Sequence, residues 1–527
     1  MSASGADRAV VEGLANLLGR ERVLENADDR AFFSHDIYSR GVVPLCVIRP
    51  ARVELLAESV KRATDARLAV IARGGGSSYT GGYLPVGERS ILVDTQDLDQ
   101  IVEINAADMY VTVEAGVTWR ALNDALAPMG LRTPFWGPLS GGVATVGGTL
   151  SQNGILWGSA RHGASPESVL GLEVVLASGA LLSTGSAGSV GFKPFFRHYG
   201  PDLTGLFLGD AGALGIKARA TLRLIRRPRA AATASFGFPT HTALAEAMAE
   251  IARENLVSEC FGMDPDLQRQ RMKRTTLAAD VKALAGVFTS AGSLLDGAKE
   301  AAKVVAAGRS FLDGVDFSMH ACVEGRAEGD VSTGMGEVRE ICRRLGAREV
   351  ADTIPKVLRG DPFVPMSSSI GPQGERWAPV HGVVALSDAV PTWSAVRALF
   401  DSRREDLDRH GVVIGVLTAI AGPTALVVEP VFYWPGPRTP YHQRVLDPAT
   451  LARFTDFPDH PEATALVADL RARLLDLFKE RGAAHMQIGK AYPYRASRRP
   501  ESWRLLESLK DALDPNRLMN PGALGLE

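Results

Sequence analysis

The segment ARGGGSSYTGG (72–82) constrains the fold more than any other part of the sequence, because five glycines and two serines directly follow an apolar run. Consecutive glycines let backbone N–H groups converge on an anion without obstruction by Cβ atoms, as a pyrophosphate site requires. A Rossmann unit would need a helix immediately after the glycines. Here Tyr79, further glycines and Pro85 follow instead. The segment therefore indicates a phosphate-binding loop outside the Rossmann class, with a flexible surface loop as the alternative.

A second glycine-rich stretch strengthens the first interpretation. PLSGGVATVGGTLSQNG (138–154) again combines glycine with serine, threonine and asparagine, and GSARHGASPESVLGLEVVLASG (158–179) follows it closely. Two such stretches near each other in the chain favour a nucleotide-binding site over chance linkers.

The pattern of apolar residues predicts an α+β chain. Strands are expected at 44–50, 68–76, 90–95, 101–105 and 109–117, a helix at 53–66 and a hairpin at 172–184. The chain becomes helical and poor in glycine from about 240 to 350, as in 241–256 and 336–350, and strands alternate with helices again to about 435. An amphipathic helix at the start of 500–522 is expected to stop at Asp514-Pro515.

Charge and hydropathy exclude several classes of function. The 527 residues carry a formal charge of −2, which provides no overall field for nucleic acid or an anionic membrane. The basic stretch 217–229 alternates arginine with apolar residues, so a strand with one solvated face is favoured over a polyanion site. The apolar run 411–432 could span a bilayer, but Gly422-Pro423 divides it, and two buried strands are expected.

The remaining bulk features predict a cytoplasmic protein. Four widely separated cysteines fit neither a disulfide framework nor a CxxC metal site, and the first ten residues lack the apolar segment of a secretion signal. Hydrolase and Walker motifs are absent from the sequence.

Five blocks, in this order along the chain, resemble the FAD-linked oxidoreductases of the vanillyl-alcohol-oxidase/p-cresol-methylhydroxylase superfamily. They are VIRPARVELLAESVKRATDARLAVIARGGGSS (47–78), GGTLSQNG (147–154), SVLGLEVVLASG (168–179), YGPDLTGLFLGDAGALGIKARATLRL (199–224) and DALDPNRLMNPG (511–522). The resemblance implies an α+β fold: a two-part FAD-binding domain of the p-cresol-methylhydroxylase type with an α+β substrate cap domain. It places the FAD-binding domain at 1–228, the cap at 229–483 and a C-terminal return to the FAD domain at 484–527.

The same resemblance implies which residues hold the FAD. The first loop, with the arginine before it, would cradle the pyrophosphate through Arg73, Gly74, Gly75, Gly76, Ser77 and Ser78. The second loop would line the isoalloxazine and ribityl portion through Gly147, Gly148, Thr149, Ser151, Asn153 and Gly154. Gly215 and Ile216 would lie near the flavin or adenine edge, and Asn520 would contact the cofactor from the C-terminal return.

Whether the FAD is covalently attached depends on few positions. Some relatives link it through a histidine beside the first loop, where this chain has Gly75, Gly76 and Ser77. Bicovalent relatives add a cysteine in the second loop region, and 147–163 contains none. His381, in RWAPVHGVVALS (376–387), lies near the position of a linking histidine in the cap of other relatives. Noncovalent FAD is expected, with a link through His381 as the alternative.

Two subfamilies suggest different substrates. Oxidation of a 2-hydroxy acid needs a base and cationic groups for the carboxylate. The element AHMQIGK (484–490) resembles a degraded form of that subfamily's C-terminal motif and keeps His485 as the candidate base, with Lys490. Arg438 and Arg495 are further candidate anchors for the carboxylate. The cap stretch 416–436 contains no histidine, so no metal site is expected.

Oxidation of a para-substituted phenol is the other reading. Tyr79 matches one tyrosine of that subfamily's phenolate site, but its Tyr-Arg pair falls on about Gly482 and Ala483, and its acidic residue falls near Ala164. Tyr492, Tyr494 and Arg495 are nearby substitutes.

Fewer substitutions are required for the 2-hydroxy acid, so the sequence favours an FAD-dependent oxidoreductase acting on CH–OH groups, with benzylic CH groups as the alternative. A flavin-binding protein without catalytic activity is the third reading. O2, a quinone or a cytochrome would accept the electrons, and a homodimer would be compatible with the family. No partner nucleic acid and no membrane span are expected.

Overall fold

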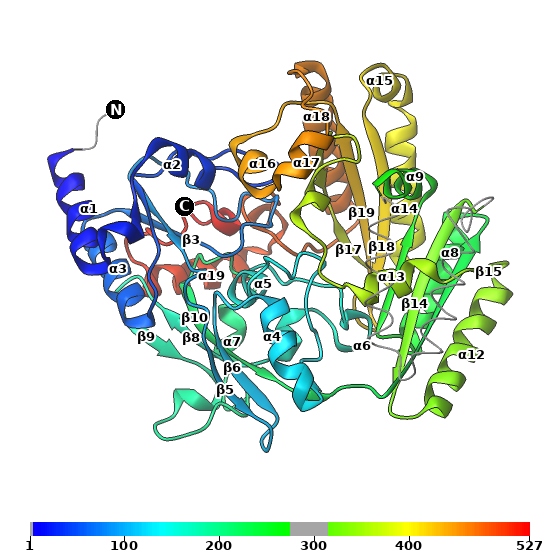
Figure 1. Ribbon diagram of the computed structural model, residues 1–527, viewed down its shortest axis with the longest axis horizontal. Helices are drawn as coiled ribbons and strands as arrows, with labels where there is room; N and C mark the ends of the chain where they lie inside the picture. The colour runs from blue at the N-terminus through cyan, green and yellow to red at the C-terminus, as the bar shows by residue number, and fades with distance from the viewer. Residues whose placement is uncertain (1–3, 275–314) are drawn as a thin grey trace.

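The computed structural model describes residues 4–274 and 315–527 (Figure 1). The N-terminal part begins with a four-stranded sheet whose order is β1-β2-β4-β3. Its strands are β1 (Val23–Leu24), β2 (Cys46–Ile48), β3 (Ala69–Arg73) and β4 (Ser90–Asp94). Helix α3 (Val53–Asp65) crosses from β2 to β3 and buries Val53, Leu56, Val60 and Ala63, which recur at helical spacing. Strands β2 and β3 both pair with β4 in parallel, so their C-terminal ends lie at one edge, where β3 runs into the glycine loop.

A second sheet supports the other glycine-rich loop. Its five strands are antiparallel in the order β5-β6-β10-β8-β9. They are β5 (Ile101–Asn105), β6 (Tyr110–Glu114), β8 (Val169–Val175), β9 (Leu181–Ser183) and β10 (Ile216–Arg223). Helices α4 (Trp119–Leu126) and α5 (Val146–Ser151) pack on it, and Trp119 donates its indole N–H to Thr149 Oγ1 over 2.8 Å. This bond fixes α5, which carries the second loop, against the sheet.

The cap is built on one large antiparallel sheet, in the order β15-β12-β14-β13-β18-β19-β16, with β17 pairing with β19. Its strands are β12 (Ala230–Phe238), β13 (Glu259–Met263), β14 (Phe317–Gly325), β15 (Arg348–Val350), β16 (Arg376–Pro379), β17 (Gly382–Ala385), β18 (Val413–Ile420) and β19 (Ala425–Trp434). Four helices cover one face and form the largest apolar core with it: α8 (His241–Arg253), α12 (Glu328–Arg344), α14 (Ala389–Asp401) and α18 (Pro461–Glu480). Figure 1 shows α8 and α12 at the right of the cap, on the side away from the first two sheets.

The chain returns from the cap to the first sheet, as the red segment in Figure 1 shows. Ala484 pairs with Val383 of the cap, helix α19 (Pro500–Leu513) follows, and Met519 then pairs with Val70 of β3. Asn520 donates hydrogen bonds to the carbonyl oxygens of Gly82 and Ala211. The C-terminal segment is therefore fastened to the first glycine loop and to the segment that carries Ala211.

Most predicted elements are confirmed. The apolar run 411–432 forms β18 and most of β19, joined by a turn at Gly422, which has a φ of +75°. Among the described residues, no helix is long and apolar enough to cross a membrane. The helix predicted at 336–350 begins earlier and ends at Arg344, because Gly346 adopts a φ of +78° before β15. Part of the helical stretch predicted at 240–350 falls at 275–314, outside the described residues.

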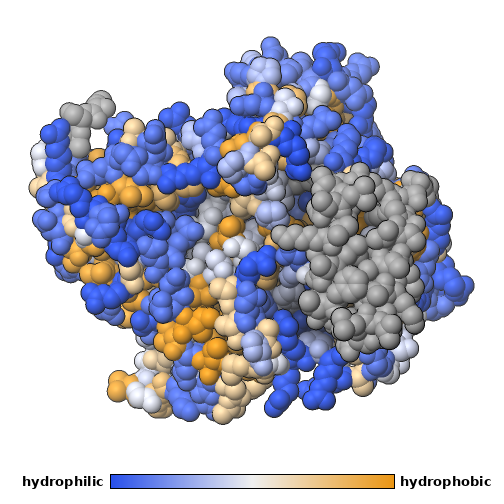
Figure 2. Space-filling view, viewed as in Figure 1, coloured by the Kyte–Doolittle hydropathy of each residue, from blue (hydrophilic) through white to orange (hydrophobic). Residues whose placement is uncertain are grey.

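Apolar side chains are unevenly distributed on the surface. On the face shown in Figure 2, apolar residues gather over the first two sheets, at lower left, whereas the upper part is mostly hydrophilic. The large apolar side chains with high exposure concentrate in one stretch, where they are Leu181, Val190, Phe192, Phe195, Phe196, Tyr199 and Leu203.

Candidate cofactor cavity and active site

The two glycine-rich loops approach each other so closely that side chains are excluded between them. A Cβ atom on Gly75 would lie 1.8 Å from the carbonyl oxygen of Val143, and one on Gly74 would lie 2.3 Å from Thr145 Oγ1. Gly76 adopts a φ of +69°, which favours glycine. Gly75 is thus required by the approach of a second backbone, and Gly76 by its own backbone conformation.

A cavity with about 900 Å³ of unfilled space, part of it continuous with solvent, lies between these loops. Twelve of the residues predicted to hold the cofactor line it: Gly74, Gly75, Gly76, Ser77, Ser78, Gly147, Gly148, Thr149, Ser151, Gly154, Gly215 and Ile216. The described lining includes the cation Lys217 and no carboxylate, which suits an anionic group such as pyrophosphate. The cavity therefore fits an extended dinucleotide such as FAD.

Lys217 and Asp210 fix the loop that closes one end of this cavity. Their buried ion pair spans 2.5 Å between Nζ and Oδ1. The Asp210 carboxylate also accepts hydrogen bonds from the backbone N–H groups of Gly212 and Leu214. This pair keeps Gly212 and Gly215 in the cavity wall. Of these two glycines, only Gly215 was predicted from the sequence to lie at the cofactor.

Three predicted cofactor residues lie outside the cavity lining. The Arg73 guanidinium lies over the rings of Phe32 and Phe33, 4.5 Å from each centroid, and supports the loop from behind. Asn153 lines a neighbouring cavity instead, and its Oδ1 atom is buried without a hydrogen-bond partner. Asn520 acts through the backbone contacts given above.

His381 also lies away from the cavity lining, in the core of the cap. Its Nε2 atom is 2.6 Å from the Met486 carbonyl oxygen, so Nε2 carries the proton, and Nδ1 accepts from the Tyr492 hydroxyl at 3.0 Å. Burial lowers the pKa of His381 to about 3. Both ring nitrogens are therefore occupied within the protein.

A buried carboxyl group on the cap sheet is linked to the cofactor cavity by hydrogen bonds. Glu429, on β19, accepts a hydrogen bond from the Tyr79 hydroxyl at 3.3 Å, and Tyr79 in turn accepts one from Gln487 Nε2 at 3.3 Å. Gln487 lines the cofactor cavity. A short hydrogen-bonded chain thus connects the cavity wall to a carboxyl group of the cap. Burial raises the pKa of Glu429 to about 7.

The surroundings of this chain are largely apolar and aromatic. The Trp377 ring lies edge-on to the Tyr79 ring with centroids 5.6 Å apart. Phe261 and Met263 of β13 belong to two small apolar clusters on the same face of the sheet, which also include Val427 and Val431, the neighbours of Glu429 on β19. Glu429 is therefore a carboxyl group in a largely apolar setting, as general acid–base residues often are.

Sequence reasoning missed Glu429 and Gln487. Glu429 is the only charged residue of VLTAIAGPTALVVEPVFYW (416–434), and an isolated carboxyl group in a buried strand is a recognisable signal. Gln487 lies inside the AHMQIGK element, between His485 and Lys490, which were predicted to be catalytic.

The other predicted catalytic residues lie apart from Tyr79. His485 donates from Nδ1 to the His381 carbonyl oxygen over 2.8 Å and stacks on Tyr492 with centroids 4.2 Å apart; it lines the neighbouring cavity with Tyr494. Lys490 Nζ donates to Asn520 Oδ1 over 2.8 Å and to the Leu84 carbonyl oxygen. Arg495 lies over the Trp503 ring at 5.2 Å. Their catalytic roles remain predictions.

No group of three or more His, Cys, Asp or Glu side chains within 4–274 and 315–527 is placed to hold a metal ion.

Comparisons with known proteins agree with this geometry. Residues 44–185 match the model of the FAD binding domain, and residues 488–524 match that of the C-terminal domain of FAD linked oxidases. The chain is 34% identical over 198 residues to a probable mitochondrial D-lactate dehydrogenase of Danio rerio, covering 37% of this chain and 38% of that protein. It is 28% identical to the glycolate oxidase subunit GlcD of Bacillus subtilis, covering 47% of this chain and 51% of that protein. The matches thus span about half, or less, of these relatives.

Solved structures match over the whole chain. Substrate-bound p-cresol methylhydroxylase superposes with a TM-score of 0.75 at 19% identity, covering 100% of this chain and 98% of that one. The 4-ethylphenol oxidase of Gulosibacter chungangensis superposes with a TM-score of 0.68 at 18% identity, with the same coverage. The chain therefore contains an FAD binding domain and the C-terminal domain of FAD linked oxidases, shares the fold of p-cresol methylhydroxylase, and has FAD as its cofactor.

Proposed function

We propose that this protein is an FAD-dependent oxidoreductase that oxidises a small alcohol or a benzylic CH group, with Glu429 as the proton acceptor. The observation that carries the proposal is the buried Glu429 carboxyl group, connected through Tyr79 and Gln487 to the wall of the cofactor cavity. FAD, when bound, supplies the acceptor for the hydride that leaves the substrate carbon.

Glu429 is suited to take up the substrate's hydroxyl proton. A general base works best when its pKa lies near the operating pH, and burial raises the pKa of this carboxyl group to about 7. The Tyr79 hydroxyl donates to Glu429 Oε1 and so orients the carboxylate. The substrate loses a hydride from its C–H bond to the FAD and a proton from its hydroxyl group to Glu429, and it is left as a carbonyl compound.

An aromatic alcohol or a para-substituted phenol fits the surroundings best. Trp377, Phe261 and Met263 provide aromatic and apolar surface near the Tyr79–Glu429 pair. Two cations considered as carboxylate anchors are engaged elsewhere: Lys490 with Asn520, and Arg438 with the Phe454 carbonyl oxygen.

A 2-hydroxy acid is the second candidate. It is supported by the D-lactate dehydrogenase and glycolate oxidase subunit among the relatives. Arg271, on α9 (Pro265–Arg274), is near enough for its positive charge to act on Glu429, and it would be the anchor for a substrate carboxylate.

We also propose that the FAD is bound noncovalently. Glycine and serine occupy positions 75–77 in the first loop, and both ring nitrogens of His381 are hydrogen bonded within the cap. Denaturation should therefore release the flavin into the supernatant.

Anaerobic reduction of the bound flavin tests the proposal. We would add aromatic alcohols and para-alkylphenols, then D-2-hydroxy acids, and follow loss of the visible flavin band. A productive substrate should bleach the wild-type protein and bleach Glu429→Gln far more slowly, while the exposed control Glu337→Gln should match wild type. If only hydroxy acids bleach the flavin, and Arg271→Met no longer bleaches with them, the 2-hydroxy acid would be selected as the substrate. An equal rate in Glu429→Gln would refute the role of this carboxyl group.

A further inference from the structure

A second, strongly basic cavity lies where the cofactor-binding part meets the cap. It contains about 1800 Å³ of unfilled space, part of it continuous with solvent. From the cofactor side it is lined by β7 (Leu131–Arg132), α6 (Ser159–His162) and β11 (Ile225–Arg226), and from the cap by the end of β14 and the start of α12. Its lining includes six arginines: Arg132, Arg161, Arg226, Arg227, Arg229 and Arg326.

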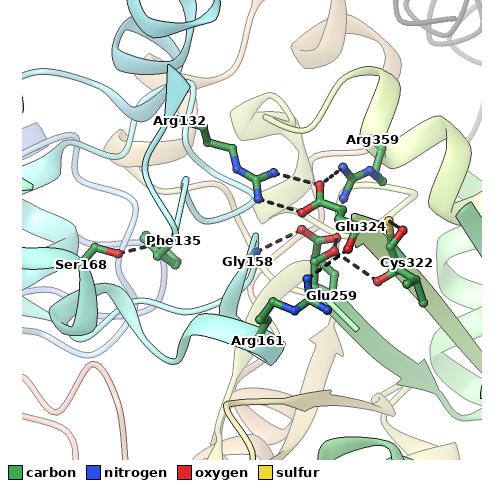
Figure 3. Close-up of polar contacts among 11 residues, drawn as sticks. Arg132, Phe135, Gly158, Arg161, Ser168, Glu259, Cys322, Glu324 and Arg359 are labelled. Carbon is green, nitrogen blue, oxygen red and sulfur yellow. Dashed lines mark hydrogen bonds and ion pairs between the residues drawn. The ribbon is translucent and has the colours of Figure 1, made fainter. Parts of the chain in front are cut away.

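The inner wall of this cavity is a rigid network of ion pairs (Figure 3). Arg132 binds both carboxylate oxygens of Glu324 over 2.8 and 2.9 Å, and Arg359 bridges Glu324 and Glu259. Although burial opposes ionisation, Arg132 and Arg359 lower the pKa of Glu324 to about 2. Arg132 and Arg359 carry two positive charges, and Glu324 and Glu259 carry two negative charges, so this network is neutral by itself. Glu324 therefore does not offset the charge of the other arginines in the cavity.

The outer wall carries arginines that have no partners of their own. Arg226, Arg227, Arg229 and Arg326 are exposed, and their side chains make no hydrogen bond or ion pair within the described parts of the chain. The acidic residues that line the cavity besides Glu324 are Glu254 and Asp330. The cavity therefore has an excess of positive charge.

The excess of positive charge also affects the pKa of neighbouring groups. Burial, followed by the charges of Arg132, Arg223 and Arg161, lowers the pKa of His162 to about 4. Partial loss of solvent around its charge and the charge of Arg132 also lower the pKa of Arg227 from its usual value. Arg132 and Arg161 are engaged with Glu324, so Arg226, Arg227, Arg229 and Arg326 are the guanidinium groups that can bind phosphate or carboxylate groups through paired N–H donors.

We propose that this cavity binds a small polyanion, a molecule carrying at least two phosphate or carboxylate groups, between the cofactor-binding part and the cap. Arg227 and Arg229, on the connection between the two parts, and Arg326, on the cap, would hold the ligand against the wall formed by Arg132 and Arg161. The basic stretch 217–229 forms β10 as far as Arg223 and then β11 at Ile225–Arg226, and its last three arginines line this second site.

The test uses the FAD-loaded protein, in which the cofactor's own phosphate site is filled. Binding of inorganic pyrophosphate and, separately, of citrate would be measured by titration calorimetry at low ionic strength and again with added NaCl. The site variant is Arg227→Ala/Arg229→Ala. The matched control is Arg52→Ala/Arg481→Ala, which removes two exposed arginines that also lack ion pairs and lie outside this cavity.

We expect at least one probe to bind with a dissociation constant of about 100 µM or less, and affinity to fall as salt is added. The site variant should weaken binding at least about tenfold, whereas the control should bind as wild type does. Pyrophosphate binding without citrate binding assigns the site to phosphates, and the reverse assigns it to polycarboxylates. Absence of binding by both probes, or equal binding by the site variant and the control, would overturn the proposal. Melting temperature and flavin content would establish that both variants fold.

Discussion

Replacing Gly75 by alanine is expected to abolish stable FAD binding while leaving most of the fold intact. The added Cβ would lie 1.8 Å from the Val143 carbonyl oxygen, whereas ordinary contact begins at 3.4 Å. The obstacle is backbone rather than a flexible side chain, so the two cofactor loops must separate by well over an ångström. Overpacking of this kind costs about 1–3 kcal/mol. If the cost falls on the FAD-bound form, affinity drops by about one to two orders of magnitude.

Gly142→Ala is the matched control, because it lies in the neighbouring loop and its Cβ would meet nothing closer than 3.7 Å. Both variants would be purified, their FAD content measured by absorbance, and FAD titrated into the apoproteins while flavin fluorescence is recorded. Gly75→Ala should contain little flavin and bind it weakly, and Gly142→Ala should resemble wild type. Wild-type affinity in Gly75→Ala would refute the argument that this close approach forms the cofactor site.

Four further predictions concern other parts of the molecule. The rate of flavin reduction should rise with pH through about 7 as Glu429 ionises, and Glu429→Gln should lose that dependence in stopped-flow measurements. Because the folded-state pKa of Glu429 is raised, the contribution of this residue to the free energy of unfolding is present at low pH and is lost as pH rises to about 7. The loss should be roughly 3 kcal/mol, measured by urea titrations of wild type against Glu429→Gln. Glu324→Ala should cost about 3–5 kcal/mol because it leaves Arg132 buried without a counter-charge, whereas the exposed Glu349→Ala should cost less than about 1 kcal/mol; equal denaturation midpoints would contradict this. Asn520→Ala should accelerate FAD release, seen as recovery of flavin fluorescence after dilution, since it removes the hydrogen bonds to Gly82 and Ala211.

The sequence predicted the cofactor side of the molecule well because the signals there are local. A strand that runs directly into glycines, and a second glycine-rich stretch, determine their own backbone conformations, and twelve of the selected residues line one cavity. The division of the run 411–432 into two strands was equally local, since it depended on one Gly-Pro pair.

The substrate side was harder to predict because its contacts join distant parts of the chain. Tyr79 was found from its motif, but its partner Glu429 lies 350 residues later. Lys490 was selected for its position in a motif, yet its side chain turns to Asn520. Arg73 adjoins the glycine loop, but the rings of Phe32 and Phe33 determine where its guanidinium lies. The spacing of residues in the sequence does not identify such tertiary partners.

The fastening of the C-terminal segment to Gly82 and Ala211 has a consequence for biosynthesis. Gln487 completes the cavity wall, and Asn520 ties Gly82 to Ala211, yet both residues are translated after the whole of the cap. A nascent chain that has emerged only as far as α18 has both glycine loops but lacks these two contacts. Stable capture of FAD therefore follows completion of the cap, and flavin loading reports that the chain has been synthesised and folded through Asn520.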